Sequence, residues 1–268
     1  MKRIMKKIIF VMLAALFMAN EAKAFVAFGH ETIAALANKH MTEKAKGEVK
    51  AILGTDMIKA CSWLNTLRKK GGGMEYTKDW HFFNLDQEGK CTTMNENDGV
   101  VQLEKAVEVL RDRANQKDSL VQASLKTVIH LVGDMHCLSH VRIDAVEDSK
   151  GFRFFHWNER EGKDRKDWNS LWYNHWEKGY LGRYGIFSPQ YYGDDIDIYA
   201  RDKKAAYEQG TPRFWVENMG EDVLRTLEVY KPEEIIPTQT IQTYEFLHTK
   251  CMAKAAYRLA ALLNDIFK

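Results

Sequence analysis

The stretch from His130 to His140 carries three histidines and one aspartate on an otherwise apolar run. The apolar residues before it recur at helical spacing and predict a helix over 118–138. His130 and Asp134 are four residues apart, so they share one face of that helix. A buried carboxylate beside an imidazole needs a compensating partner, and a structural ion pair is the common one. His140 favours a metal ion instead, because zinc sites gather several nitrogen and carboxylate ligands.

The rest of the chain shows the same helical periodicity and contains only four prolines. This pattern predicts an all-α fold, a single-domain bundle of about eight helices with long functional loops. Thr42 and Asp98 are the expected N-caps of two of these helices. Besides the central helix, we expect helices at 30–45, 42–53, 56–69, 98–115, 167–179, 196–208, 212–230 and 238–267. Residues 74–97 and 181–195 are expected to be loops, and residues 152–155 a short strand or a loop.

The N-terminus has the pattern of a secretory signal peptide. Residues 2–7 are rich in basic side chains, residues 8–19 are almost wholly apolar, and Ala22-Lys23-Ala24 fits a cleavage site. We therefore expect residues 1–24 to be removed, the protein to be exported to the periplasm or beyond, and a domain over 25–268 to begin at Phe25. The apolar run is too short to span a bilayer comfortably, so no membrane span is expected.

Removal of this segment changes the charge of the protein. The full sequence has a net charge of +2, and residues 1–24 hold five basic residues against one acidic residue, so residues 25–268 have a net charge of −2. That balance excludes a basic nucleic-acid binder of the usual kind. If the protein handles phosphates, bound cations must supply the local positive charge.

Further candidate ligands lie outside the central helix. His30 is informative because it follows the expected N-terminal residue Phe25 by five positions. A freed α-amine and its own carbonyl oxygen form a chelate ring, so signal cleavage would create a ligand. For His30 alone, an ordinary surface histidine is the better explanation. The remaining candidates are His81, His156, His175 and Glu177.

Several motifs, in order along the chain, resemble those of the S1/P1 nuclease family. They are Gly29-His30 after Phe25, Ser62-Trp63, Trp80-His81-Phe82, the stretch from His130 to His140, and Arg258-Leu259-Ala260 near the C-terminus. The resemblance implies an all-helical fold that holds three zinc ions. It also implies an exported zinc-dependent endonuclease or phosphodiesterase, which hydrolyses single-stranded DNA or RNA, or 3′-nucleotides, to 5′-phosphates. We expect it to act as a monomer.

The same resemblance implies a role for each matching residue. One zinc would take His81, His130 and Asp134, with Asn65 at a further ligand position. Asp134 would bridge to a second zinc, held also by Phe25 and His30. His140 and Glu177 would belong to a third zinc. Phe82 matches a ring that stacks on a nucleobase, although core packing is an equal alternative for it, and Asn84 is a second candidate for substrate contact.

Four cysteines in an exported chain suggest disulfides, with three possible connectivities. The resemblance implies a bridge between Cys91 and Cys251, which would join the loop after His81 to the last helix. The pairing of Cys61 and Cys137 stays open.

Three departures from the family pattern affect the expected chemistry. Asn65 stands where the family has an aspartate that holds the attacking water, and an amide cannot accept a proton. Tyr173 stands where the third site has a histidine. Leu138 replaces a proline, and a central helix that ran unbroken to His140 would turn that residue away from the face of His130. The alternatives are therefore a catalytically weakened zinc- or nucleotide-binding member of the fold, or a zinc phospholipase C.

Overall fold

The computed structural model describes residues 27–68, 71–91, 95–144, 146, 153–158, 162–167, 188–229, 235–236 and 238–268. The expected signal segment, Phe25, Tyr173, His175, Glu177 and most of the helix expected at 167–179 lie outside these residues. For His156 the structure describes the backbone of its strand but not the side chain.

Helices dominate the described residues and confirm the all-α prediction. The α-helices are α2 (Ala27–His40), α3 (Glu43–Leu53), α4 (Met57–Ala60), α5 (Trp63–Leu67), α6 (Gly99–Arg111), α7 (Asp118–Met135), α10 (Pro189–Ala200), α11 (Lys204–Tyr207), α12 (Pro212–Val229) and α13 (Thr238–Ile266). The 3₁₀ helices are η1 (Glu75–His81), η2 (Arg113–Asn115), η3 (Leu138–His140) and η6 (Arg201–Lys203). The expected N-caps are confirmed, because Thr42 accepts a hydrogen bond from the Ala45 amide and Asp98 accepts one from the Val100 amide.

Short strands connect the helices at two places. β1 (Phe83–Leu85) and β2 (Val141–Ile143) form a parallel pair, in which Asn84 lies opposite Arg142. β3 (Arg153–Asn158) pairs antiparallel with β4 (Gly162–Asp167) and parallel with β5 (Ile235–Ile236). Residues 74–97, which were expected to form a loop, therefore contain η1 and β1. Residues 152–155 were expected to be a short strand or a loop, and 153–155 belong to β3.

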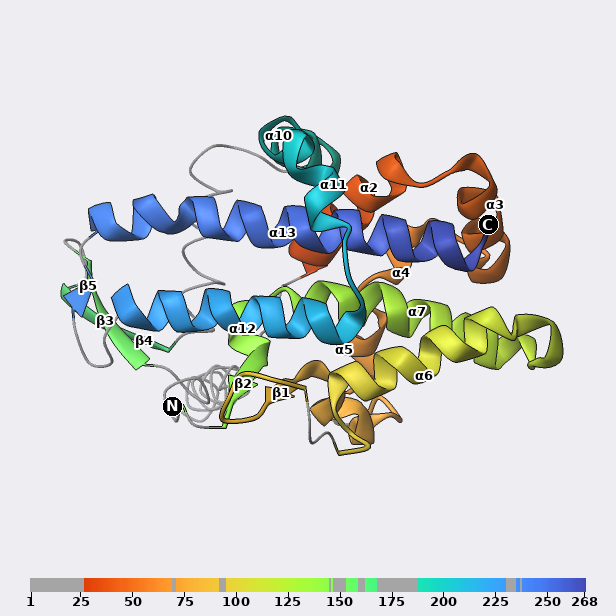
Figure 1. Ribbon diagram of the computed structural model, residues 1–268, viewed down its shortest axis with the longest axis horizontal. Helices are drawn as coiled ribbons and strands as arrows, with labels where there is room; N and C mark the ends of the chain where they lie inside the picture. The colour runs from red at the N-terminus through yellow and green to blue at the C-terminus, as the bar shows by residue number, and fades with distance from the viewer. Residues whose placement is uncertain are drawn as a thin grey trace, which may run out of the picture.

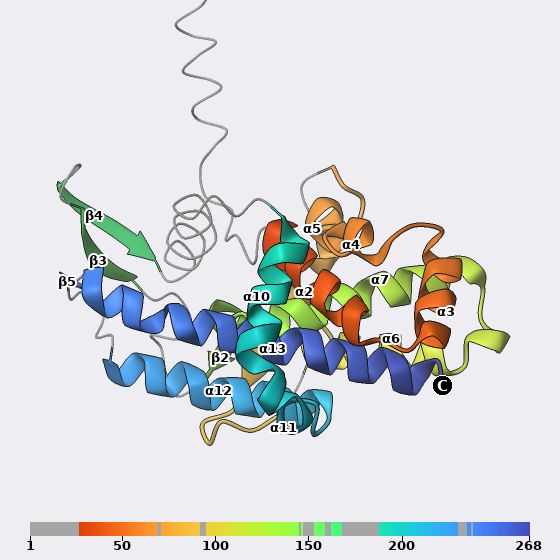
Figure 2. The same ribbon diagram turned by 90° about the horizontal axis from the view of Figure 1, so that it is seen from above.

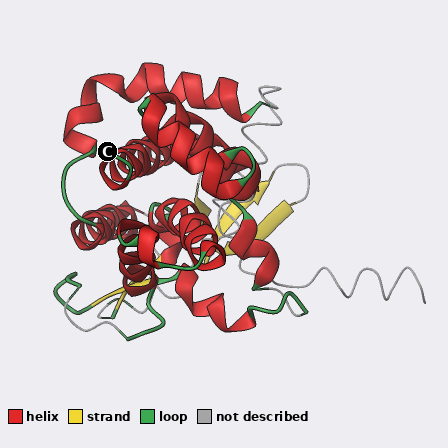
Figure 3. Cartoon of the chain, turned by 90° about the vertical axis from the view of Figure 1, so that its right-hand side faces the viewer, coloured by secondary structure: helices red, strands yellow, loops and turns green. Residues whose placement is uncertain are grey.

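The long helix α13 runs through the molecule, with α12 beside it (Figure 1). Seen from above, α10 crosses α13 and packs on α2 (Figure 2). On the other side, α6 packs along α7, and α7 contacts both α13 and α2. The end-on view shows helices making up most of the molecule, with only short strands among them (Figure 3). Together these contacts bring α2, α7 and the η1–β1 segment to a common interior.

The apolar face of α7 explains why that helix occupies the centre. Leu125, Val128, Ile129 and Val132 are all at most 1 % exposed. At roughly 25 cal/mol per Å² of buried apolar surface, each contributes about 1.5–3 kcal/mol. No helix in the described part of the chain is both long enough and apolar enough to be a membrane span.

The predicted disulfide between Cys91 and Cys251 is wrong for this structure, in which all four cysteines are free thiols. Cys91 contacts the backbone carbonyl of Arg213 at the start of α12. Asn218 pairs with Arg258 and Asp222 with Lys250, so α12 and α13 run antiparallel. The start of α12 therefore faces a part of α13 that lies beyond Cys251. Burial raises the pKa of the Cys91 and Cys251 thiols to about 12.

Candidate metal centre

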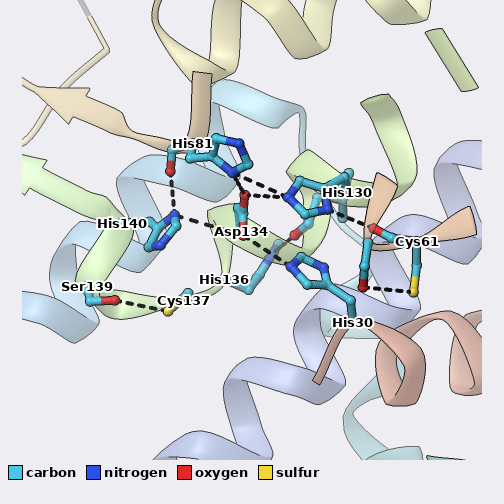
Figure 4. Close-up of polar contacts among 11 residues, drawn as sticks. His30, Cys61, His81, His130, Asp134, His136, Cys137, Ser139 and His140 are labelled. Atoms are coloured by element: carbon cyan, nitrogen blue, oxygen red, sulfur yellow. Dashed lines mark hydrogen bonds and ion pairs between the residues drawn. The ribbon is translucent and has the colours of Figure 1, made fainter. Parts of the chain in front are cut away.

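Four histidines and one aspartate from separate segments meet in the interior (Figure 4). His30 comes from α2, His81 from the end of η1, His130 and Asp134 from α7, and His140 from η3. Each is at most 1 % exposed. Such a concentration of buried polar groups is costly unless a ligand or mutual contacts compensate it.

Asp134 is the centre of this cluster. Its Oδ2 atom lies 2.6 Å from His81 Nδ1 and 3.1 Å from His130 Nε2. Its Oδ1 atom lies 3.3 Å from His30 Nε2 and 3.9 Å from His140 Nδ1. The two carboxylate oxygens therefore face two different sets of imidazoles, which is the arrangement that a bridging carboxylate requires.

Close helix packing brings His30 to this centre. Its ring stacks on that of His130, with centroids 4.2 Å apart and planes 19° from parallel. Gly133 makes room, because a Cβ atom there would lie 2.7 Å from His30 Nδ1. A larger residue at position 133 would push α2 away from α7.

A break in the helix brings His140 to the same centre. The unbroken helix considered above is wrong, because α7 ends at Met135 and η3 folds back. His136, the residue after α7, donates from Nδ1 to the Val132 carbonyl and accepts at Nε2 from Arg258 of α13. These two contacts fix the end of the helix without the proline of the family motif.

Backbone carbonyls orient two of the imidazoles. His130 Nδ1 donates to the carbonyl of Cys61 at 2.7 Å, and His140 Nδ1 donates to the carbonyl of His81. A histidine held in this way presents the lone pair of its other nitrogen, which is the usual arrangement of metal-ligating histidines.

The pKa values of the cluster match those of metal ligands. Burial lowers the pKa of His30 and of His140 to about 4, and it lowers the pKa of His81 as well. Burial alone would raise the pKa of Asp134, but the surrounding imidazoles outweigh it and hold that pKa well below its usual range. Neutral imidazoles around an ionised carboxylate are the protonation states that a metal ion binds.

The donor set fits a metal ion. One ligand atom each from His30, His130 and Asp134 lie within 4.8 Å of one another. Among the described residues, three buried atoms of this region have no hydrogen-bond partner, namely Asp134 Oδ1, His81 Nε2 and Asn65 Oδ1. Buried polar atoms are normally satisfied, so a cluster of unsatisfied ones indicates a missing ligand.

Two arginines near the cluster were missed by the sequence reasoning. The charge of Arg68, together with burial, lowers the pKa of His81 and His140. Arg68 lies three residues after Asn65, so their helical spacing was the available signal. The guanidinium carbon of Arg142 lies 3.4 Å from the centroid of the Phe82 ring. No local pattern marked Arg142, because its contact with Phe82 depends on the pairing of β1 with β2.

The two residues expected to contact substrate lie on β1 or next to it. Phe82 is half-buried, and its ring centroid is 5.3 Å from that of His140. The backbone and side-chain amides of Asn84 both donate to Asp98, the N-cap of α6. Phe25 and Glu177, the other expected ligands, lie outside the described residues.

Comparison with known protein families identifies the family of this chain. The model of the S1/P1 nuclease family matches residues 25–268, which is nearly the whole chain. A search of curated proteins finds no match.

Proposed function

Because this chain belongs to the S1/P1 nuclease family, we propose that it is an exported, zinc-dependent phosphodiesterase. Family membership indicates a metal-dependent nuclease in general terms. Our proposal adds that the protein hydrolyses single-stranded nucleic acid or 3′-nucleotides and leaves 5′-phosphates. The observation that carries it is the buried carboxylate of Asp134, which faces four imidazoles.

The proposed ligands divide between the two oxygens of Asp134. His81 and His130 would hold one ion with Oδ2, and Asn65 would contribute its amide oxygen. His30 would hold a second ion with Oδ1 and with the backbone of Phe25. His140 and Glu177 would hold a third. When bound, zinc ions supply positive charge that polarises a phosphoryl oxygen and activates water for attack.

The chain's own residues prepare the site for this chemistry. The charged Asp134 and the neutral imidazoles of His30, His81 and His140 are ready to bind ions without prior loss of a proton. The charge of the Arg68 guanidinium acts on His81 and His140, and it would also attract a phosphate bound at the metal centre. The Asn65 amide can orient a water by a hydrogen bond, but it cannot take the proton of that water.

One observation favours a second candidate function. Asn65 stands where the family has an aspartate, so the site lacks a carboxylate at this position. The alternative is therefore a zinc- or nucleotide-binding protein with weak turnover. A zinc phospholipase C is less well supported, because the family whose model matches residues 25–268 is a nuclease family.

Metal analysis and hydrolysis assays on residues 25–268 test the proposal. We expect bound zinc, cleavage of single-stranded DNA in preference to duplex, loss of activity with a chelator and recovery with zinc. Asp134→Asn should lose both metal and activity, whereas Asp118→Asn, at an exposed position of the same helix, should retain both. Full zinc occupancy without hydrolysis of DNA or 3′-nucleotides would establish the binding function, and absence of metal would overturn both.

A further inference from the structure

A guanidinium group covers the ring of Phe82. The central carbon of Arg142 lies over the ring, 3.4 Å from its centroid, which is a close cation–π contact. Both side chains are half-buried. A nucleobase could stack on that face of Phe82 only if the guanidinium moved away.

The parallel pair β1–β2 places Arg142 there. Phe83 and Leu85 on β1 pair with Val141 and Ile143 on β2, and these four side chains are buried. Side chains alternate along a strand, so the intervening positions point to the opposite face. That face carries Asn84 and its partner Arg142, and Phe82 precedes β1 at the matching position.

The covered ring lies next to the metal centre. The Phe82 centroid is 5.3 Å from that of His140, and His140 Nδ1 is 3.9 Å from Asp134 Oδ1. The Arg142 guanidinium and the proposed metal ligand His140 thus both lie against the same Phe82 ring. A strand bound at the metal centre would pass close to it.

The chemistry of this cation suits a phosphate. Within the described part of the chain the Arg142 guanidinium makes no hydrogen bond, and Asp79 acts on it only through its charge. Contact with the Phe82 ring holds the guanidinium in place, and its N–H donors remain available to a ligand. Planar, oriented N–H donors match the oxygens of a phosphate group, and the contact is indifferent to the base.

We propose that Arg142, held on Phe82, binds a phosphate of the nucleic-acid strand, so that Phe82 is the platform for a cation rather than for a nucleobase. The inference rests on the proposed function, because the ligand is the substrate strand. It makes Arg142 a residue that determines specificity for the sugar–phosphate backbone.

A binding experiment with two strands distinguishes a phosphate contact from base stacking. Both strands are linked by phosphorothioates to resist hydrolysis. One is oligothymidine, and the other has the same length but carries abasic residues. The zinc-loaded chain is compared with Arg142→Gln, Phe82→Leu and the control Arg201→Gln, at an exposed position of η6. Affinities are measured over a range of salt concentrations.

We expect Arg142→Gln to weaken both strands by the same factor. It should also reduce the slope of log K against log salt by about 0.7, the value for one phosphate contact to a single strand. Phe82→Leu should weaken both strands equally, and Arg201→Gln should change neither. An unchanged slope in Arg142→Gln, or a loss confined to oligothymidine in Phe82→Leu, would overturn the inference.

The two proposals fail in different ways. A parent protein that cleaves single-stranded DNA but shows an unchanged slope in Arg142→Gln contradicts only the role of Arg142. A parent protein that neither binds nor cleaves either kind of strand contradicts the proposed function and this inference together.

Discussion

Asn65 is the residue whose chemistry most limits the proposed reaction. Its buried Oδ1 atom has no hydrogen-bond partner among the described residues, so it is available to an ion or a water, but it carries no charge. A carboxylate in its place would accept the proton of an attacking water. Since general bases contribute about a hundredfold or more, we expect Asn65→Asp to raise the initial rate on single-stranded DNA by about that factor. Asn95→Asp, at an exposed position, should leave the rate unchanged.

Tyr173 provides the second arm of this test. If the tyrosine weakens the third zinc site, Asn65→Asp alone will gain little, and the double variant with Tyr173→His will be needed for the increase. Initial rates and zinc content are measured together for the parent, both single variants and the double variant. Four equally inactive proteins with full zinc occupancy would exclude a damaged nuclease and leave the binding function.

Predictability at the residue scale depended on sequence distance. The four-residue spacing of His130 and Asp134 was enough to place them on one helix face. His140 was expected to join them because it follows the helix closely, whereas the assignment of His30 and His81 came from the family resemblance. The structure brings all three to Asp134. The hydrogen bonds of Asn84 to Asp98 were not predictable, because they depend on how the chain folds back between β1 and α6.

Helices were predictable as elements, but their ends were not. The expected helix at 118–138 ends at Met135, because a side chain from α13 contacts His136. The expected helix at 56–69 is divided into α4 and α5. The expected loop at 181–195 is wrong in its last part, where α10 begins at Pro189 after the capping residue Ser188. That start carried a local signal, a serine followed by a proline in the first helical turn.

The contact between α12 and α13 depends on a buried acidic group. Asp222 Oδ2 lies 2.8 Å from Lys254 Nζ, Asp222 Oδ1 lies 2.7 Å from Lys250 Nζ, and Asp222 and Lys254 are each 3 % exposed. Among the described residues, Asp222→Ala leaves the buried Lys254 ammonium with only the Asn218 side chain as a partner. We expect a loss of about 3–5 kcal/mol in the free energy of unfolding, measured with urea.

Asp265 offers a control for this loss. It forms an exposed ion pair with Arg111, and exposed pairs contribute about 0–1 kcal/mol. Asp265→Ala should therefore cost far less than Asp222→Ala. Equal costs would mean that the buried pair does not hold the two helices together.

At the scale of the whole molecule, the all-α class followed from the periodicity of the sequence. Periodicity reports which face of a helix is buried, so it predicts a helical bundle but not which helices are neighbours. The packing of α10 across α2 and α13 needed information about side chains far apart in sequence. That packing centres on Asp197 of α10.

Asp197 makes the stability of this packing depend on pH. Its Oδ1 accepts from His40 at 2.7 Å and from Tyr257 at 2.8 Å, and its Oδ2 lies 2.9 Å from Lys39 Nζ. Burial alone would raise the pKa of Asp197, but the hydrogen bonds from Lys39, Tyr257 and His40 lower it to about 2. An unfolded aspartate has a pKa of about 3.9. Because the pKa in the folded state is the lower one, the stabilisation is complete above pH ~4 and is lost as the pH falls toward 2.

The free energy of unfolding of the parent and of Asp197→Asn should therefore converge on acidification. The asparagine cannot ionise, so the difference should reach about 1–2 kcal/mol above pH ~4, allowing for solvent screening of Lys39, and should shrink to near zero at pH ~2. Urea unfolding at several pH values measures it, and the comparison cancels acidic groups that both proteins share. Asp195→Asn, at an exposed position of the same helix, should show no such convergence. A difference between the parent and Asp197→Asn that stays constant between pH 4 and pH 2 would show that the charge of Asp197 does not hold α10 against α2 and α13.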